Sequence, residues 1–135
     1  MPDESARYDE GLRVRREVLG SAHVDAALAG QTDFDAPFQR FITEVAWGSL
    51  WSRPELDRRT RSLLTIAILA ALGRKEELEL HLRASQSAGA TPEEVREALL
   101  HVAVYAGIPS ANSAMALAKG RFASPADPAG ESRAP

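Results

Sequence analysis

Apolar residues recur at helical spacing along most of the chain, from about Tyr8 to Leu117. No segment alternates apolar and polar residues as a half-buried β-strand does, so the pattern predicts an all-α fold. We expect a single-domain bundle of about six to seven helices. The predicted helices span about Glu4–Leu19, His23–Leu28, Asp33–Arg53, Asp57–Leu72, Lys75–Ala88, Pro92–Tyr105 and Pro109–Lys119.

The ends of these helices carry local signals. Gly20 and Gly30 follow the first two helices, and glycine readily adopts the left-handed geometry that ends a helix. Asp57 is placed to cap the fourth helix. The segment Thr91-Pro92-Glu93-Glu94 combines an N-cap, a proline at the first helical position and a reciprocal carboxylate, and it therefore predicts the start of the sixth helix.

Two of the helices are predicted to bury large apolar surfaces. The fourth is apolar on nearly every side after Leu63, so it needs cover on most sides, and contacts between subunits are one source of that cover. The expected apolar side of the third helix carries Phe38, Phe41, Ile42, Val45 and Trp51.

The length of 135 residues, with 44% hydrophobic residues, suits one compact domain and is too short for two ordinary ones. We place that domain at residues 1–120. Residues 121–135 are rich in proline and small side chains and are expected to form a disordered C-terminal tail. The chain has no apolar run long enough for a bilayer span and no secretory signal at its start, so we expect a cytoplasmic protein.

Composition narrows the chemistry. Cysteine is absent, which excludes disulfides, thiolate metal sites, cysteine nucleophiles and dithiol redox chemistry. The net charge of -3 gives no general attraction to nucleic acid or to an anionic membrane, so neither is expected as a partner. The basic residues are nearly all arginine, the side chain suited to bidentate recognition of carboxylates. These features favour a small molecule or a protein as the partner, and the arginine bias suits an anionic one.

The third helix places Glu44, Trp47 and Trp51 on one stripe at α-helical spacing. A partly desolvated carboxyl group holds its proton more tightly, which suits a general acid or base. The alternative is that Glu44 is an edge carboxylate bonded to an arginine, and that both indoles belong to the core or to an interface.

Arg58, Arg59 and Arg61 occupy the first turn of the fourth helix, where the helix dipole already makes extra cations unfavourable. Together with the helix N-terminus they could bind a small carboxylate. The alternative is that they pair with acids such as Glu44, Glu55 or Asp57, or remain solvated.

His81 shares a stripe of the fifth helix with Leu78, Leu82 and Ser85, so its imidazole faces inward. It is the best catalytic candidate among the histidines, although a lone histidine on an apolar stripe is more often a core residue. Glu77 is the sole metal-ligand type one turn away, so no metal is expected. No phosphate-binding glycine loop is present either, which leaves chemistry without a cofactor.

Several segments together resemble the 4-carboxymuconolactone decarboxylase family, over about residues 7–120. They are Arg13-Val14-Arg15-Arg16-Glu17-Val18-Leu19-Gly20, Trp47-Gly48-Ser49-Leu50-Trp51-Ser52-Arg53-Pro54, Leu56-Asp57-Arg58-Arg59-Thr60-Arg61-Ser62-Leu63-Leu64-Thr65-Ile66-Ala67, His81-Leu82-Arg83-Ala84, the cap that begins at Thr91, and Tyr105-Ala106-Gly107-Ile108-Pro109-Ser110-Ala111-Asn112-Ser113-Ala114.

The resemblance implies conversion of 4-carboxymuconolactone, an anionic lactone, to 3-oxoadipate enol-lactone with loss of carbon dioxide, in the protocatechuate branch of the β-ketoadipate pathway. It also implies an alkylhydroperoxidase D-like helical fold, assembled as a homo-oligomer, a hexamer or a trimer. The redox relatives carry a Cys-x-x-Cys pair where this chain has Arg74 and Glu77, while their histidine corresponds to His81. The loss of both thiols excludes peroxide chemistry.

On this hypothesis His81 delivers the proton, and Glu44 orients it or shares the task. Arg58 and Arg59 hold carboxylate or enolate oxygens, Arg16 is a further candidate for that role, and the two indoles limit water. Two other functions remain open: a non-catalytic helical oligomer that binds a small acid, and a lactone hydrolase or isomerase.

Overall fold

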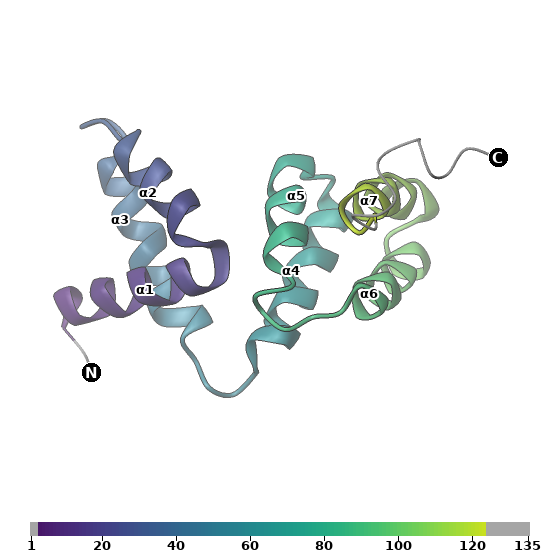
Figure 1. The fold of residues 1–135 in the computed structure, drawn as a ribbon, viewed down its shortest axis with the longest axis horizontal. Coiled ribbons are helices and arrows are strands. Elements are labelled where there is room, and N and C mark those ends of the chain that lie inside the picture. Colours follow the sequence, from purple (N-terminus) through teal and green to yellow (C-terminus); the bar gives the residue numbers. More distant parts are fainter. Residues whose placement is uncertain (1–2, 124–135) are drawn as a thin grey trace. The chain divides into compact units, whose positions relative to one another are not determined.

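The computed structural model describes residues 3–123, which contain seven α-helices and one π-helix and no strand. The predicted all-α fold is therefore confirmed. The chain divides into two compact units, residues 1–61 and 62–135, each with its own packing (Figure 1). From residue 124 onward, the predicted tail lies outside the described residues.

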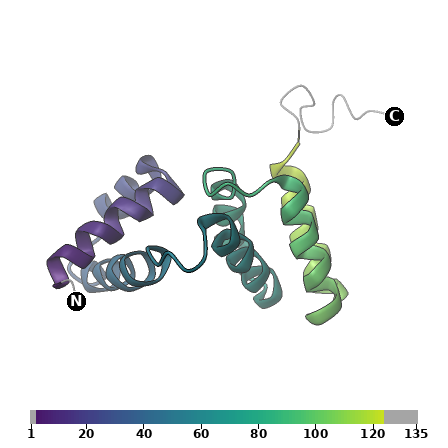
Figure 2. The same cartoon turned by 90° about the horizontal axis from the view of Figure 1, so that it is seen from below.

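The first unit contains α1 (Glu4–Leu19), α2 (Ser21–Ala29), α3 (Ala36–Ile42) and the π-helix η1 (Thr43–Trp51). Helix α3 continues directly into η1, and α1 packs along η1 (Figure 2). The two backbones approach closely because each element has a glycine at the contact. A Cβ atom on Gly11 would collide with the carbonyl oxygen of Thr43, and one on Gly48 with that of Arg7.

The third predicted helix differs from the structure in its start and its register. It begins at Ala36 rather than near Asp33, and from Thr43 it is a π-helix, with hydrogen bonds that span five residues instead of four. The predicted apolar side is only partly confirmed, since Trp51 is buried and Ile42 is half-buried. Phe38, Phe41 and Val45 are exposed, whereas the buried residues of η1 are Thr43, Glu44, Trp47 and Trp51.

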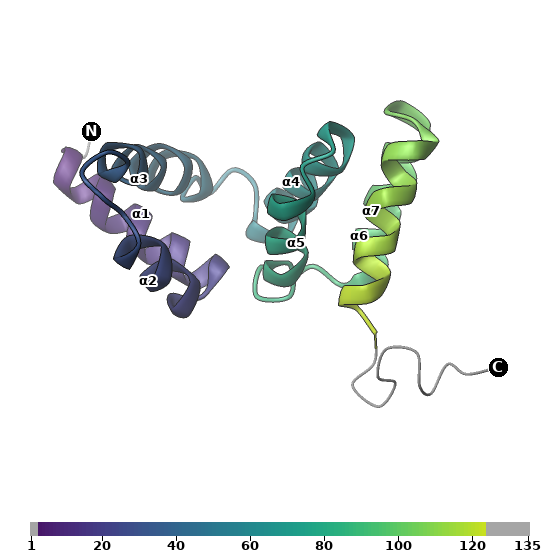
Figure 3. The same cartoon turned by 90° about the horizontal axis from the view of Figure 1, so that it is seen from above.

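The second unit is built from α4 (Arg58–Leu72, whose first turn belongs to the first unit), α5 (Lys75–Ala84), α6 (Pro92–Tyr105) and α7 (Ile108–Arg121). Helices α6 and α7 pack side by side, and α5 packs on α7 (Figure 3). Their buried apolar side chains form one core. It consists of Ile66, Ala70, Leu78, Leu82, Val95, Leu99, Val102, Ala111, Ala114 and Ala118, with Phe122 packed against it.

Most predicted helix ends are confirmed. The Asp57 carboxylate accepts the Thr60 backbone N–H at 2.8 Å, and Thr91 and Glu94 form the predicted capping box. Gly20 has the predicted positive φ of 93°, and α2 ends at Gly30 as predicted, although Gly30 has a right-handed φ of -83°. Helix α5 ends four residues before the predicted Ala88, where the Ser85 hydroxyl donates to the Leu82 carbonyl and competes with the helical backbone bonds.

Helix α4 keeps large apolar side chains exposed within the described residues. Leu64, Ile68 and Leu72 recur every four residues and are about half exposed or more. None of the helices in residues 3–123 has both the length and the apolar character that crossing a membrane requires.

Candidate active site

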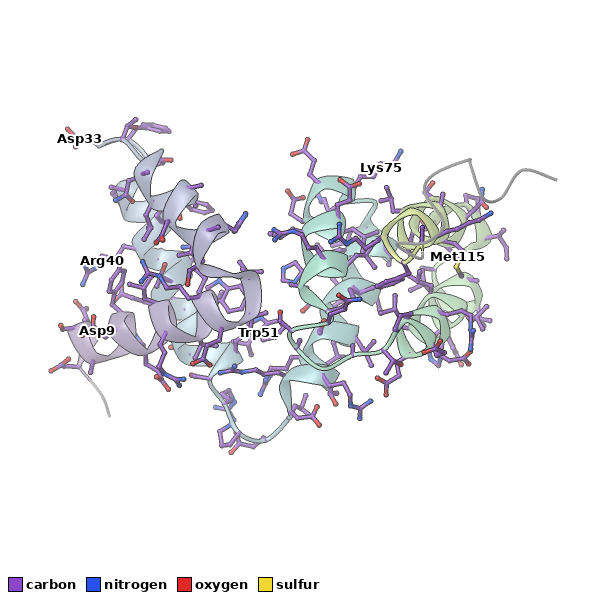
Figure 4. The ribbon with its side chains drawn as sticks, viewed as in Figure 1. Asp9, Asp33, Arg40, Trp51, Lys75 and Met115 are labelled. Carbon is purple, nitrogen blue, oxygen red and sulfur yellow. The ribbon has the colours of Figure 1, made fainter. Side chains whose placement is uncertain are left out.

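The predicted site residues fall in both units. The first unit holds Arg16, Glu44, Trp47, Trp51, Arg58 and Arg59, and the second holds His81. Figure 4 labels Arg40, which contacts Glu44, and Trp51 at the end of η1. The meeting of His81 with the other candidates in one site stays a prediction.

Glu44 is a buried carboxylate with a cationic neighbour. Its residue is only 9% exposed, and Arg40 Nε lies 3.4 Å from its Oε1, one turn earlier in the chain. The Arg40 guanidinium also lies over the Tyr8 ring, 5.0 Å from its centroid. The contact with Arg40 agrees with the interpretation of Glu44 as a carboxylate bonded to an arginine. Its burial agrees with the other interpretation, a general acid or base.

The indoles of Trp47 and Trp51 form a pair. Their ring centroids are 5.0 Å apart with planes inclined by 30°, and both residues are buried. Residues four apart lie on the same face of a helix, which is the spacing of this pair. The pair is a large apolar body, and Glu44 lies on the same element.

Arg58 pairs with an acid that the sequence analysis did not name. Its Nη1 lies 2.7 Å from Glu17 Oε1, and the other oxygen of Glu17 lies 2.8 Å from Arg13 Nη1. The Arg58 hydrogen bond lowers the pKa of Glu17 below its usual value of 4.5. Because α1 is far from α4 in the chain, no local spacing could have indicated this partner.

The acids named as partners of the arginine cluster each have a contact outside it, although the pKa of Asp57 is lowered by its hydrogen bonds to Thr60 and also by the charge of Arg59. Glu55 lies 3.5 Å from Arg53, Asp57 caps α4, and Glu44 pairs with Arg40. Arg58 thus pairs with an acid, as the alternative interpretation expected, but the acid is Glu17 and not one of the three that it named.

Arg61 is buried, and its Nη2 donates to the Arg53 carbonyl at 3.2 Å. Arg59 is half-buried in the same turn of α4. Arg16 faces α2, where its Nη2 lies 2.7 Å from Asp25 Oδ1. Arg58 thus pairs with Glu17 on α1, and Arg16 pairs with Asp25 on α2.

Sequence reasoning missed Arg15, the most buried charged residue of the first unit. It is 4% exposed and donates to Thr43 Oγ1 at 3.0 Å and to Gln39 Oε1 at 3.1 Å. Burial lowers the pKa of its guanidinium. A signal was present, because Arg15 shares the buried stripe of α1 with Gly11, Val14 and Val18 at helical spacing.

His81 is a half-buried residue of α5, and in the sequence it lies between Leu78 and Leu82, which both belong to the core. Its Nδ1 atom is inaccessible to solvent, and Leu78 and Leu82 on the same helix are fully buried. The predicted inward stripe of α5 is therefore confirmed, whereas the role of the imidazole stays a prediction. Within residues 3–123 no three potential ligands gather as a metal site would need.

Comparison with known proteins identifies the family of this chain, which the geometry of the site does not. The family model described as "Carboxymuconolactone decarboxylase family" matches residues 36–120. The chain is 52% identical over 122 residues to "4-carboxymuconolactone decarboxylase" of Acinetobacter baylyi, covering 90% of each chain. It is 50% identical over 108 residues to "Nitrosuccinic acid decarboxylase npaB" of Metarhizium robertsii, covering 80% of this chain and 76% of the relative. A helical chain with this extent of identity, and with the predicted motifs in place, belongs to the carboxymuconolactone decarboxylase family.

Proposed function

We propose that this protein is a carboxy-lyase that converts 4-carboxymuconolactone to 3-oxoadipate enol-lactone and carbon dioxide. One observation carries the proposal: the 52% identity to a protein named for this activity extends over nine-tenths of both chains. We further place the reaction in the protocatechuate branch of the β-ketoadipate pathway, in the cytoplasm.

The substrate contains its own electron sink. When the bond between the ring carbon and the carboxylate breaks, its electron pair moves through the unsaturated ring onto the lactone oxygen, and carbon dioxide leaves. A proton then adds to a ring carbon to give the enol-lactone. No organic cofactor is needed for this sequence, so the protein has to bind the acid groups, stabilise the developing negative oxygen and deliver one proton.

The proton step is assigned to His81, with Glu44 orienting it or sharing the task. Glu44 suits this role because it is buried beside Arg40 and lies on the same element as two indoles. Trp47 and Trp51 supply apolar surface that excludes water from the carbanion. A drier site strengthens each charged contact inside it.

Arg58, Arg59 and Arg16 are assigned to the acid groups of the substrate. The departing carboxylate must not be held too firmly, since stabilising the ground state raises the barrier. We therefore assign the grip on the retained acetate side chain to Arg58, whose present partner is a carboxylate of the chain itself.

A homo-oligomer, a hexamer or a trimer, is proposed as the working assembly. Two exposed apolar stripes support this. Phe34, Phe38, Phe41 and Val45 are exposed, three or four residues apart, from the turn before α3 into η1, and Leu64, Ile68 and Leu72 are exposed along α4. Exposed patches of large apolar side chains are typical of protein interfaces.

A second candidate is the decarboxylation of nitrosuccinic acid, favoured by the 50% identity to the Metarhizium enzyme of that name. The two substrates share a chemical logic. Each is a diacid that loses one carboxylate, keeps the other, and has an oxygen-terminated group to accept the electron pair. The same arginine and the same proton donor could serve both reactions.

The test is direct. Purified protein is mixed separately with 4-carboxymuconolactone and with 2-nitrosuccinate, and carbon dioxide and the organic product are measured. We expect gas and enol-lactone from the first at a kcat/KM well above that for the second, and the reverse ranking would support the second candidate. Saturable binding without gas would instead indicate a non-catalytic acid-binding protein, and a ring-opened or isomerised product without gas would indicate a hydrolase or isomerase.

A further inference from the structure

Arg15 carries a charge in an unusual place. Its guanidinium is almost fully buried, and both of its hydrogen-bond acceptors, Thr43 Oγ1 and Gln39 Oε1, are neutral. Within residues 3–123 it forms no ion pair with a carboxylate. Burying a charge without an opposite charge is costly, and an apolar side chain would pack two helices more favourably. The packing of the two helices alone therefore does not explain why a charged side chain is buried at position 15.

The two acceptors lie on either side of the point where the α-helix becomes a π-helix. Gln39 belongs to α3, and Thr43 is the first residue of η1. The Thr43 hydroxyl also donates to the Gln39 backbone carbonyl at 2.7 Å. One guanidinium thus links two side chains that flank the junction, and one of those side chains bonds back to the backbone before it.

Helix α1 also contacts the junction with its backbone. A Cβ atom on Gly11, one turn before Arg15, would collide with the Thr43 carbonyl oxygen and lie 2.8 Å from the Gly48 nitrogen. Thr43 and Gly48 are five residues apart, the spacing that a π-helical hydrogen bond joins. The contact surface of α1 therefore fits the π form of this segment.

The register at this junction decides where the candidate catalytic side chains lie. Removing the extra residue of a π turn would rotate every later residue by about 100° relative to α3, since an α-helix has 3.6 residues per turn. Glu44 and the indole pair would then turn out of their buried positions.

We propose that Arg15 is a positioning residue, which holds the junction between α3 and η1 in the π form and thereby places Glu44 and the Trp47–Trp51 pair. The catalytic part of this inference rests on the proposed function of Glu44. The conformational part does not, because the only two tryptophans of the chain both lie in η1. Tryptophan emission and near-ultraviolet circular dichroism therefore report on this element whether or not the substrate is correct.

The experiment compares Arg15→Met, Arg15→Lys and Thr43→Val with the parent protein and with the control Arg96→Met, which makes the same change at an exposed position of α6. In Arg15→Met we expect red-shifted tryptophan emission, a changed near-ultraviolet spectrum, and kcat lowered by about 10- to 100-fold. KM should change by less than about threefold, because the acid-binding arginines are untouched. Arg15→Lys should recover part of kcat, and Arg96→Met should match the parent.

Unchanged emission and kcat in folded Arg15→Met would overturn the proposal. Normal kcat with a lowered melting temperature would overturn it as well, since Arg15 would then be a structural residue only. Should Arg15→Met fail to fold, Arg15→Lys and Thr43→Val carry the same test. If the parent protein itself releases no carbon dioxide, the proposed function fails, whereas the tryptophan signals still decide whether Arg15 holds the junction.

Discussion

Arg58 Nη1 lies 2.7 Å from Glu17 Oε1, which ties the first turn of α4 to α1. Glu17 also contacts Arg13, and Arg13 is in turn held by both carboxylate oxygens of Glu10. The arginine proposed to grip the substrate is therefore already paired with a carboxylate of its own chain. A carboxylate of the substrate therefore has to displace Glu17 from Arg58. Glu17 keeps its ion pair with Arg13 when this contact is lost.

This competition predicts that Glu17→Gln lowers KM for the lactone by several-fold and leaves kcat within about twofold, because the change removes a rival for Arg58 without touching the proton step. Initial-rate kinetics at fixed ionic strength would measure it. Glu10→Gln is the matched control, since Glu10 contacts Arg13 and interacts with Arg58 only through the longer-range attraction of their charges. A KM that rises in Glu17→Gln would mean that Arg58 does not bind the substrate.

The ion pair between Arg58 and Glu17 also predicts that the stability of the protein depends on pH. The pKa of Glu17 is lowered in the folded state, first by the Arg58 hydrogen bond. Its contribution to the free energy of unfolding is therefore fully present above the usual glutamate pKa and is lost as pH falls through the lowered value. Melting temperatures of the parent and of Glu17→Gln, measured from pH 7 down to about pH 3, should differ at neutral pH and converge in acid. A constant difference would contradict this assignment.

Several helix starts and ends could be predicted from the sequence, because each of these signals depends on residues that are close together in the chain. The span of α1, Glu4–Leu19, agrees with its prediction, and the Asp57 cap and the Thr91 capping box are in place. These features involve side chains within three or four positions of one another, which is the range over which spacing carries information.

What sequence reasoning missed arises between distant segments. Helix α1 contacts the π-helix η1 at Gly11 and Arg15, and no pattern within residues 43–51 indicates a π register. The pairing of Arg58 with Glu17 is likewise a tertiary contact. The residue types of the candidate site could thus be predicted, but their partners could not.

The close contact of α1 with η1 predicts that Gly11→Ala destabilises the first unit. The new methyl group would overlap the Thr43 carbonyl oxygen, which is backbone and cannot move aside cheaply. Overpacking of this kind costs about 1–3 kcal/mol or more. Gly120→Ala is the control: it lies near the end of α7 with open space around it, and it should instead stabilise by about 0.5–1 kcal/mol. Urea denaturation followed by far-ultraviolet circular dichroism, which reports on the helices of both units, would separate the two, and equal stabilities would refute the close fit.

The exposed stripe on α4 predicts that Ile68→Asp weakens the assembly. Ile68 is 57% exposed in the middle of the stripe, and a carboxylate there would have to be desolvated in an apolar interface. Light scattering should show a smaller particle with unchanged helical content. Gln86→Asp adds the same charge at an exposed turn outside the stripe and should leave the mass unchanged. An unaltered mass in Ile68→Asp would place any interface elsewhere.

The proton step predicts a contrast between two histidines. His81→Ala should lower kcat for carbon dioxide release by about 10²–10⁴-fold with a small change in KM, since a general acid acts in the transition state. His101→Ala is the matched control, because His101 is an exposed residue of α6 stacked on Tyr105, with ring centroids 4.9 Å apart. Glu44→Gln keeps the size of the side chain and removes its charge, so it should also lower kcat if Glu44 orients the imidazole or shares its proton. Equal turnover in folded His81→Ala and His101→Ala would remove His81 from the mechanism and leave Glu44 as the remaining candidate for the proton donor.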